Sequence, residues 1–352
     1  MLDNWRQTVT PEPDKLLRQV LRITPEPFTY FDEYQVHRLL TENPLEYLRW
    51  VRQQLADIAE GSMQLELPLK QIFCDPQNES DFRIMPCVVR NGAYICKTVK
   101  IIGTNTLQQQ IPDQITVGKA FALHPEENFV NHVFEACLLS SARTGVCAAL
   151  ATELLAPASE SLTVIGAGRV GFYAAFFAAS SDCLRSIRIA DSDSTRAIGT
   201  AALLSSMLPG LAVNAVSMKE LTDTDVVILA TTSKEPFCRP PAWGAKLVIS
   251  LGADTDNQRE LTPEWISIAD IFVDTRDSAR FGDLAAWQAA GLIATDGLAD
   301  LFDLLRQNAP RSITRPRLFI STGSALFDNL TISYLLDKAA KCATSEMKSS
   351  NL

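Results

Sequence analysis

The spacing of apolar residues changes along the chain and divides it into regions. From Pro44 to Ala59 the apolar positions have helical spacing, and Pro44 suits the first turn of a helix, where its missing N–H costs nothing. The first 20 residues are polar and contain Pro11 and Pro13, so we expect a loose arm or a partner-binding segment there. The apolar positions of the predicted helix are Leu45, Leu48, Val51, Leu55 and Ile58.

Between Gln64 and about Ala122 the pattern is typical of strands. Short runs such as MPCVV, YICKTVKII and QITVGKAFAL are rich in β-branched and aromatic residues. The turn signals Asn91-Gly92 and Pro112-Asp113 separate these runs. We therefore predict a strand-rich, largely antiparallel region.

After about residue 140 helical and strand patterns alternate. Ser140 or Ser141 is expected to cap a helix, and SLTVIGAGRVGFYAAFFAAS then predicts a strand, a tight turn and a helix of small residues. Later strands are predicted in SIRIAD, DTDVVILATTS and KLVISLGAD, up to about Ser321. This alternation predicts a parallel α/β sheet, followed by a final amphipathic helix over 325–340.

Composition and charge limit the possible functions. A chain of 352 residues suggests about two domains, and 47% hydrophobic with 21% charged residues argues against disorder. The formal net charge is -9, and there is no basic run, which disfavours nucleic acid and anionic membrane surfaces as partners. Because no apolar run reaches about 18 residues, we expect no membrane-spanning segment.

The cysteines and histidines make a metal or disulfide framework improbable. None of the eight cysteines forms a CxxC, and only three histidines are present. The N-terminal MLDNWRQTVTPEPDK has no basic stretch followed by an apolar one, so a secretory signal is not expected. We predict a cytoplasmic protein with reduced cysteines and no metal.

The segment 166–171 is a GxGxxG preceded by the apolar strand LTVI. Gly166 is expected to make the tight turn, Gly168 to let a pyrophosphate approach, and Gly171 to allow close helix–strand packing. Asp191 ends the next predicted strand, where a carboxylate accepts hydrogen bonds from ribose hydroxyls and repels a 2′-phosphate, which favours NAD over NADP. The alternative is a glycine-rich turn in a nucleotide-free fold. The expected cofactor contacts are Gly166, Gly168, Arg169, Val170, Gly171, Asp191 and Thr231.

Thr231 and Thr232 end the predicted strand DVVILATTS. The carboxyl edge of a doubly wound sheet is where ligands bind, so a cofactor contact is one interpretation of this pair. Helix capping is the competing interpretation for two threonines in that position.

Several segments in a fixed order resemble the ornithine cyclodeaminase/mu-crystallin family. SARTG immediately before the glycine motif, together with GAD some distance beyond it, is more specific than the glycine motif alone. The segments are RIMPC (83–87), KTVKIIGTN (97–105), SARTGVCAALATELLA (141–156), VVILATTS (226–233), SLGADTDNQREL (250–261) and STGSALFDNL (321–330).

The resemblance implies a two-domain homodimer. A Rossmann-type NAD-binding domain would span 141–322, and a strand-rich α+β substrate-binding and dimerisation domain would combine 1–140 with 323–352. Members oxidise or reduce the Cα–N bond of amino or imino acids. They include ornithine and lysine cyclodeaminases, alanine dehydrogenases, ketimine reductases and the enzyme that cleaves N-(2-amino-2-carboxyethyl)-glutamate to 2,3-diaminopropionate. A non-catalytic, crystallin-like role is also known on this fold.

The resemblance also implies site residues. The family's catalytic lysine falls on Lys97, eight residues before Asn105, and its carboxylate-binding arginine falls on Arg143, which is also expected to contact the cofactor. The catalytic aspartate falls on Asp254, the expected base. A looser match is Lys70 as a first substrate-binding cation, since a lysine offers a point charge rather than a bidentate fork.

Two departures concern the substrate. Cyclodeaminases carry a glutamate two residues before Met-Pro, where this chain has Arg83, and tend to carry lysine where it has Gln258. A cation suits a distal carboxylate or phosphate rather than a distal ammonium. The prediction is therefore an NAD-dependent dehydrogenase that forms 2,3-diaminopropionate and 2-oxoglutarate in secondary-metabolite or siderophore biosynthesis. Arg83 could instead face solvent or pair with Asp81.

Overall fold

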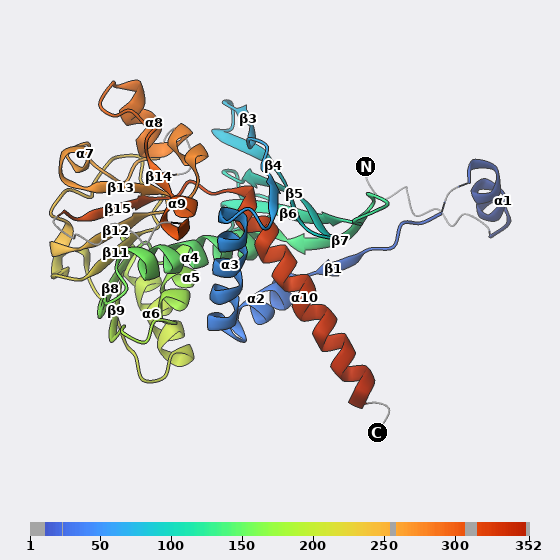
Figure 1. Ribbon diagram of the computed structural model, residues 1–352, viewed down its shortest axis with the longest axis horizontal. Helices are drawn as coiled ribbons and strands as arrows, with labels where there is room; N and C mark the ends of the chain where they lie inside the picture. The colour runs from blue at the N-terminus through green and yellow to red at the C-terminus, as the bar shows by residue number, and fades with distance from the viewer. Residues whose placement is uncertain (1–10, 23, 254–257, 307–314, 350–352) are drawn as a thin grey trace.

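The computed structural model describes residues 11–22, 24–253, 258–306 and 315–349. Within these ranges the chain forms two β-sheets that lie side by side, each accompanied by helices (Figure 1). The strand-rich sheet comes first along the chain and the parallel sheet second. A long C-terminal helix, α10 (Ala325–Ser349), then leaves the parallel sheet and packs against the first sheet.

The first sheet is predominantly antiparallel, as predicted. Its order is β1-β7-β6-β5-β4-β2, with β3 paired to β4, and the β1–β7 pair is parallel. The strands are β1 (Thr29–Phe31), β2 (Gln64–Glu66), β3 (Gln71–Asp75), β4 (Ser80–Asn91), β5 (Tyr94–Thr104), β6 (Thr116–Leu123) and β7 (Val130–Glu135). The helices before and within this region are α1 (Pro11–Leu21), α2 (Glu33–Thr41) and α3 (Pro44–Ala59).

Side chains on β4 and β5 alternate between a buried and a partly exposed face. From Cys96 to Gly103 on β5 the buried residues have even numbers and the more exposed ones have odd numbers. The buried face packs against α10, where Asn329 donates to the Cys96 carbonyl (3.0 Å) and to Thr98 Oγ1 (3.0 Å). Lys100 also lies on this buried face, although its side chain is charged. A lysine there requires ionic partners, because an unpaired buried charge is costly.

The second sheet has the topology of a dinucleotide-binding fold. Its order is β10-β9-β8-β11-β12-β15-β13-β14, and every pairing is parallel. The strand order reverses between β8 and β11, the position where doubly wound sheets bind ligands at the carboxyl edge. The strands are β8 (Ser161–Ile165), β9 (Ser186–Ala190), β10 (Ala212–Ala215), β11 (Val226–Leu229), β12 (Leu247–Ser250), β13 (Asp270–Val273), β14 (Ala299–Asp300) and β15 (Arg317–Ile320).

Six α-helices and three 3₁₀ turns of the described residues belong to this part of the chain or join it to the first sheet. The helices are α4 (Ala136–Leu155), α5 (Arg169–Ala178), α6 (Ser194–Met207), α7 (Trp265–Ile268), α8 (Gly282–Ala289) and α9 (Leu301–Arg306), of which α4 is the joining helix. The 3₁₀ turns are η2 (Met218–Glu220), η3 (Ala242–Gly244) and η4 (Arg276–Arg280).

The joining helix α4 begins earlier than predicted. Glu135, not Ser140 or Ser141, is its N-cap: its carboxylate accepts from the backbone N–H groups of Cys137 and Leu138, at 2.7 Å each. A carboxylate suits this position because it satisfies two unpaired N–H groups and complements the helix dipole. Ser141 instead bonds back to the Cys137 carbonyl inside the helix. The predicted domain boundary at 140/141 consequently falls within α4.

Two predicted helices are present, and a third helix lies where a loose arm was expected. The helix over Pro44–Ala59 is confirmed with the same bounds, capped by Asn43, and the C-terminal helix begins at Ala325. Residues 11–21 form a helix rather than a loose arm, and the earlier part of the predicted arm lies outside the described residues. No helix in the described ranges is long and apolar enough to cross a membrane.

We predict that Gly145 is required for the packing of α4 against α5. A Cβ at Gly145 would lie 2.5 Å from the Tyr173 carbonyl carbon and 2.8 Å from the Ala174 nitrogen. Gly145→Ala should therefore lower the free energy of unfolding by about 1–3 kcal/mol, as overpacking does. Urea denaturation followed by circular dichroism measures the change.

Gly199→Ala on α6 is the matched control, since nothing lies within 4 Å of a Cβ there. It should be neutral or stabilising by up to about 1 kcal/mol, because alanine loses less backbone entropy in a helix. Equal behaviour of the two variants would contradict the packing argument.

Candidate active site at the carboxyl edge of the parallel sheet

The three glycines after β8 have the geometry that the sequence predicts for them. Gly166 has φ +106°, and a Cβ there would lie 2.3 Å from the Ala230 carbonyl oxygen. A Cβ at Gly171 would lie 1.9 Å from the Gly166 oxygen, whereas nothing lies within 4 Å of a Cβ at Gly168. The turn is therefore tight on the protein side and open at Gly168, where α5 begins.

Asp191 follows β9 and faces the glycine turn. Its Oδ2 accepts from the Ala167 N–H (2.7 Å) and its Oδ1 from the Asp193 N–H (2.9 Å). A carboxylate has about four acceptor positions, so each oxygen can accept a further hydrogen bond. Arg169 and Val170 are both partly exposed at the start of α5, next to the open side of the turn.

The turns that follow the parallel strands touch one another. A Cβ at Gly252, after β12, would lie 2.1 Å from the Thr231 carbonyl oxygen, after β11. Thr231 donates both its N–H and its hydroxyl to Glu260 Oε1, at 2.8 Å each. Its hydroxyl is thus committed to a buried carboxylate, a contact that the sequence did not predict. Asp254 lies outside the described residues.

A buried ion cluster lies where α4, α10 and β5 meet. Asp328 on α10 accepts from Arg143 Nε (3.0 Å) on α4, and Lys100 Nζ on β5 lies 2.9 Å from its Oδ1 and 2.8 Å from its Oδ2. Ser140 Oγ is shared by the two cations, at 3.0 Å from Arg143 Nη2 and 3.2 Å from Lys100 Nζ. These three charged side chains are each less than one-tenth exposed. One carboxylate therefore holds two cations.

The charge state of Lys100 responds to this environment. Burial lowers the pKa of its ammonium to about 8, while the adjacent Asp328 carboxylate opposes that shift. The positive charges of Arg143 and Arg83 lower the pKa further. An amine with such a pKa exchanges protons near neutral pH, which makes it suitable for acid–base work.

Lys97 does not lie in this cluster, contrary to the expected arrangement of Lys97 beside Arg143. It is on the opposite face of β5, where its ammonium donates to the Pro125 carbonyl (2.6 Å) and Asn128 Oδ1 (2.5 Å). The alternation of strand side chains explains the difference, because residues three apart point to opposite faces. Lys100 occupies the position expected of Lys97.

Lys70 lies between the two sheets. Its ammonium donates to the Thr322 carbonyl (3.0 Å) and sits 3.5 Å from the centre of the Phe281 ring, and only 7% of the residue is exposed. Thr322 follows β15, and the neighbouring Gly323 lies against Arg143, since a Cβ there would be 2.9 Å from Nη2. The structure thus brings Lys70 and Arg143 to the same short segment.

Arg83 is buried and forms an ion pair with Asp81, which is one of the alternatives that the sequence left open. Its Nε and Nη2 donate to the two carboxylate oxygens of Asp81, at 3.0 and 3.1 Å, and the residue is 8% exposed. It lies on the buried face of β4, close enough to Lys100 to lower its pKa. Asp81 therefore orients Arg83 near the cluster rather than in solvent.

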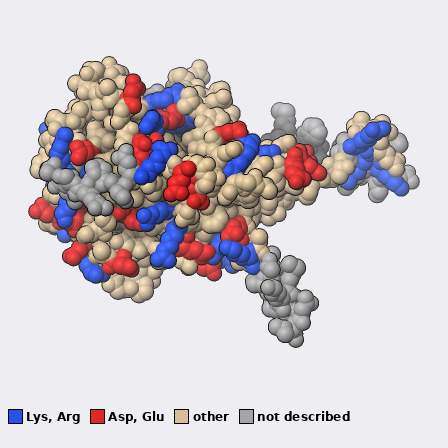
Figure 2. Space-filling view, in the orientation of Figure 1, with Lys and Arg blue, Asp and Glu red and all other residues tan. Residues whose placement is uncertain are grey.

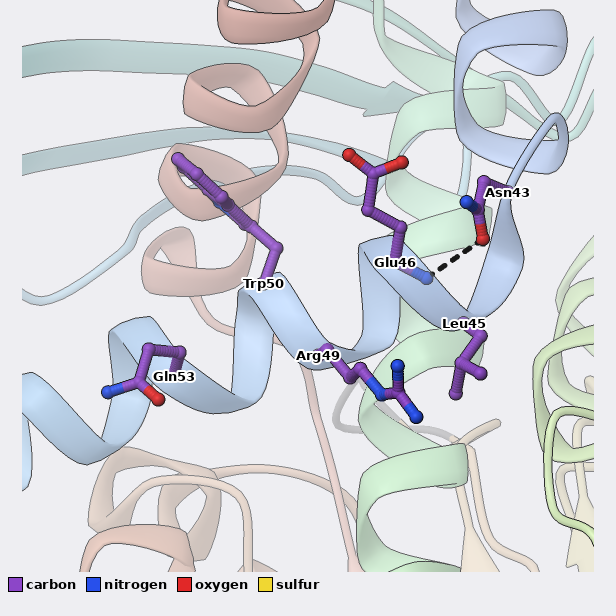
Figure 3. A pocket seen from close by; sticks show the side chains of 6 residues that line it. All are labelled: Asn43, Leu45, Glu46, Arg49, Trp50 and Gln53. Carbon is purple, nitrogen blue, oxygen red and sulfur yellow. Dashed lines mark hydrogen bonds between the residues drawn. The ribbon is translucent and has the colours of Figure 1, made fainter.

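The surface has a more mixed distribution of charge than the buried cluster. Lys and Arg are intermixed with Asp and Glu on the face drawn in Figure 2, so charge of one sign does not dominate that face. A hollow on the surface follows α3 and is lined by Asn43, Leu45, Glu46, Arg49, Trp50 and Gln53 (Figure 3). None of the candidate cofactor-binding or substrate-binding residues lines it. In the described ranges, no group of His, Cys, Asp or Glu is arranged to hold a metal ion.

We predict that Lys100 gives the stability of the protein a characteristic pH dependence. The pKa of Lys100 is about 8 in the folded chain and 10.5 for an ordinary lysine, so between these values the unfolded chain binds more protons. The free energy of unfolding should therefore rise as the pH increases through this window, and this contribution is lost as the pH falls toward 8. Lys100→Met should remove that part of the rise, as measured by urea unfolding at about pH 7.5 and pH 10.

Lys97→Met, which removes a lysine from the opposite face of β5, is the control. It should keep the pH dependence of the wild type. An unchanged pH profile in Lys100→Met would contradict the assignment of this buried titration to Lys100.

Comparison with known proteins gives a consistent family. The model of the ornithine cyclodeaminase/mu-crystallin family matches residues 35–342. The anabolic L-arginine dehydrogenase DauB of Pseudomonas aeruginosa, described as NAD(P)H-dependent, is 26% identical over 305 residues, which are 81% of this chain and 89% of that protein. The L-lysine cyclodeaminase of Streptomyces rapamycinicus is 29% identical over 248 residues, 68% of this chain and 70% of that protein. An uncharacterised protein of Schizosaccharomyces pombe is 33% identical over 47% of this chain, and the match spans 53% of its length.

Solved structures share the fold at low sequence identity. The Δ1-pyrroline-2-carboxylate reductase of Thermococcus litoralis, solved with NADH and L-proline, has a TM-score of 0.78 at 20% identity and covers 89% of this chain and 98% of that one. An archaeal alanine dehydrogenase dimer with bound NAD has a TM-score of 0.77 at 19% identity, covering 90% and 97%. The two-sheet architecture with a Rossmann-type parallel sheet is therefore that of these enzymes, and the family match over 35–342 leads to one conclusion. The chain belongs to the ornithine cyclodeaminase/mu-crystallin family.

Proposed function

We propose that this protein is an NAD-dependent oxidoreductase that acts on the Cα–N bond of an amino or imino acid. The observation that carries the proposal is the buried cluster of Arg143, Lys100 and Asp328. Its Arg143 lies against Gly323, just after β15, at the carboxyl edge of the sheet that also carries the glycine turn. Two cations that share one carboxylate can attract a further anionic group. The family's activities support this class of reaction.

The glycine turn fits a dinucleotide. The open space at Gly168 leaves room for a pyrophosphate at the N-terminus of α5, where backbone N–H groups and the helix dipole favour anions. Asp191 would accept hydrogen bonds from the ribose hydroxyls and disfavour a 2′-phosphate. Arg169, Val170 and Thr231 border the same turn region. A nicotinamide cofactor bound there would exchange a hydride with Cα.

The cluster would orient the substrate. The substrate carboxylate binds between Arg143 and Lys100, and Lys70 approaches from the first sheet as a third cation. Holding Cα in one orientation lowers the barrier by several kcal/mol in well-oriented reactions. Asp254 remains the proposed base for the substrate ammonium, and Lys100 takes the role that the sequence assigned to Lys97. In cleavage, water attacks the resulting imine and releases a 2-keto acid and an amine.

Arg83 supports a substrate with a distal carboxylate. It is buried near Lys100 and held by Asp81, so an anion there meets an oriented guanidinium. We therefore keep N-(2-amino-2-carboxyethyl)-glutamate as the proposed substrate, in a cytoplasmic pathway to a secondary metabolite or siderophore. The second candidates are ornithine or lysine cyclisation, alanine dehydrogenation and ketimine reduction. A crystallin-like binding role without catalysis is the candidate of another class.

A homodimer is part of the proposal, because the outer face of the first sheet carries an apolar patch, with Lys97 and Lys119 beside it. Ile84 pairs with Ile101 on the partly exposed face, and next to them Pro86 and Val99 pair across the same strands, with Phe121 beyond. An antiparallel sheet with one face in water normally alternates apolar and polar residues. An apolar outer face of this kind is typical of an interface. A second copy of the chain is the occupant that the family supports.

We predict that the protein reduces NAD when supplied with N-(2-amino-2-carboxyethyl)-glutamate. NADH absorbance should grow in step with 2-oxoglutarate, which is measured separately. Asp254→Asn should bind NAD as the wild type does and lose roughly 10²–10⁴-fold in kcat, because it lacks the base. Asp270→Asn changes a partly exposed aspartate on β13 that pairs with Arg315; it is the control and should keep full activity.

The outcome separates the candidates. Proline or pipecolate formed from ornithine or lysine without net NADH would favour a cyclodeaminase. NAD binding without turnover of any amino or imino acid would favour the crystallin-like, non-catalytic binding role. Full activity of Asp254→Asn would remove the proposed base.

We predict that the outer face of the first sheet joins two chains. Ile101→Glu places a charge on this face, where the residue is 42% exposed in the single chain, and should convert a two-chain species into single chains in light-scattering measurements. Ile198→Glu on α6, 61% exposed, is the matched control and should leave the mass unchanged. A wild type with the mass of one chain would contradict the dimer.

A further inference from the structure

The short segment after β15 holds two of the proposed substrate-binding cations. The Thr322 carbonyl accepts from Lys70, and Gly323 lies against the Arg143 guanidinium. The position of this segment therefore determines the distance between a cation from the first sheet and a cation on α4. A residue that holds this segment in place therefore affects the proposed site even if that residue does not contact the substrate.

Asp274 lies beneath this segment at the end of β13. The residue is 1% exposed, and it accepts hydrogen bonds from the Thr275 N–H (2.6 Å), from Ser321 Oγ (2.6 Å) and from Ser278 Oγ. Burial raises the pKa of its carboxyl, while the three hydrogen bonds and the charge of Arg143 oppose that shift. A buried carboxylate with several donors is a rigid anchor, because each donor would be left unsatisfied by a move.

Ser278 connects the Asp274 carboxylate to Thr322 by hydrogen bonds. Its single hydroxyl proton goes to Asp274, so its oxygen accepts from the Thr322 N–H (3.1 Å) and the Thr322 hydroxyl (2.9 Å). Thr322 is then held on its N–H and hydroxyl, and its carbonyl points to Lys70 (3.0 Å). A continuous chain of hydrogen bonds runs from Asp274 to the Lys70 ammonium.

The same region contacts Lys70 a second time. Phe281, directly after η4, places its ring 3.5 Å from the Lys70 ammonium. Ser278 belongs to η4, so the turn that begins next to Asp274 supplies both the relay and the ring. Lys70 belongs to the first sheet's part of the chain, before β3, whereas Asp274, Ser278 and Phe281 belong to the second. The contacts therefore join the two halves of the site.

We propose that Asp274 is a positioning residue of the active site: through Ser278 and Thr322 it sets the place of the Lys70 ammonium opposite Arg143. The proposal rests on the proposed function for its kinetic consequence, and its structural content stands without it. Asp274 acts here on the affinity for the amino-acid substrate and not on the cofactor. A merely structural carboxylate would stabilise the fold without any energetic coupling to Lys70.

The test is a double-mutant cycle with Asp274→Asn and Lys70→Met, measured by urea unfolding of the full chain without ligand. Each single variant should raise the unfolding equilibrium constant. If Asp274 acts through Lys70, the increase in the double variant should be roughly ten-fold smaller than the product of the two single increases. Ser278→Ala, which cuts the relay with a smaller change, should show the same coupling to Lys70→Met. It also keeps the test decisive if Asp274→Asn fails to fold.

The kinetic arm uses N-(2-amino-2-carboxyethyl)-glutamate and NAD. Asp274→Asn should raise the KM for the amino acid about ten-fold, with kcat within about three-fold and the KM for NAD unchanged; in the Lys70→Met background it should add no further increase. Asp270→Asn, at the partly exposed start of the same strand, should change none of these values. A wild type without turnover would refute the proposed function and leave the unfolding cycle to decide the role of Asp274.

Independent single effects in the unfolding cycle would overturn the proposal. An equal rise of both KM values in Asp274→Asn would overturn it as well, because it would indicate a general disturbance of the sheet edge.

Discussion

Two cations buried beside a single carboxylate set the main constraint on this structure. Arg143 and Lys100 both contact Asp328, and all three come from elements that are far apart in the sequence. Removing one partner of a buried ion pair costs about 3–5 kcal/mol, because the remaining charge stays desolvated. Three elements, β5, α4 and α10, must therefore meet at this point for the fold to be stable. The same requirement leaves a net positive site that is suited to an anionic ligand.

The parallel sheet supplies the other half of the site through close contacts between successive turns. The glycine turn lies against the residues after β11, and Gly252 lies against Thr231. Side chains would separate these turns, so the glycines permit an edge narrow enough for a cofactor and a substrate to meet. Glu260 ties the same turns together by accepting from Thr231, Ser250 and Gly252. The proposed cofactor and substrate regions are thus parts of one packed edge.

Most features governed by local spacing could be predicted from the sequence, apart from the start of α4 and the helix over Pro11–Leu21. Features governed by distant contacts could not. The glycine motif and the helix over Pro44–Ala59 depend on neighbouring residues, and both are present with the predicted bounds. Lys97 was assigned as the catalytic lysine because of its spacing from Asn105. The alternation of side chains along β5 instead points Lys100 toward the buried cluster. Asp328 stands inside STGSALFDNL, a segment singled out by resemblance, but its role depends on partners 185 and 228 positions away.

Lys70 shows why a lysine can serve where an arginine would be expected. A compact ammonium can donate to the Thr322 carbonyl while it lies over the Phe281 ring, and both contacts come from the parallel-sheet part of the chain. A planar guanidinium would need a wider set of acceptors in the same place. The Lys70 ammonium therefore joins the first-sheet part of the chain to the parallel-sheet part through these two contacts. If Lys70 binds the substrate as proposed, substrate affinity and the contact between the halves depend on the same side chain, so one substitution there should alter both.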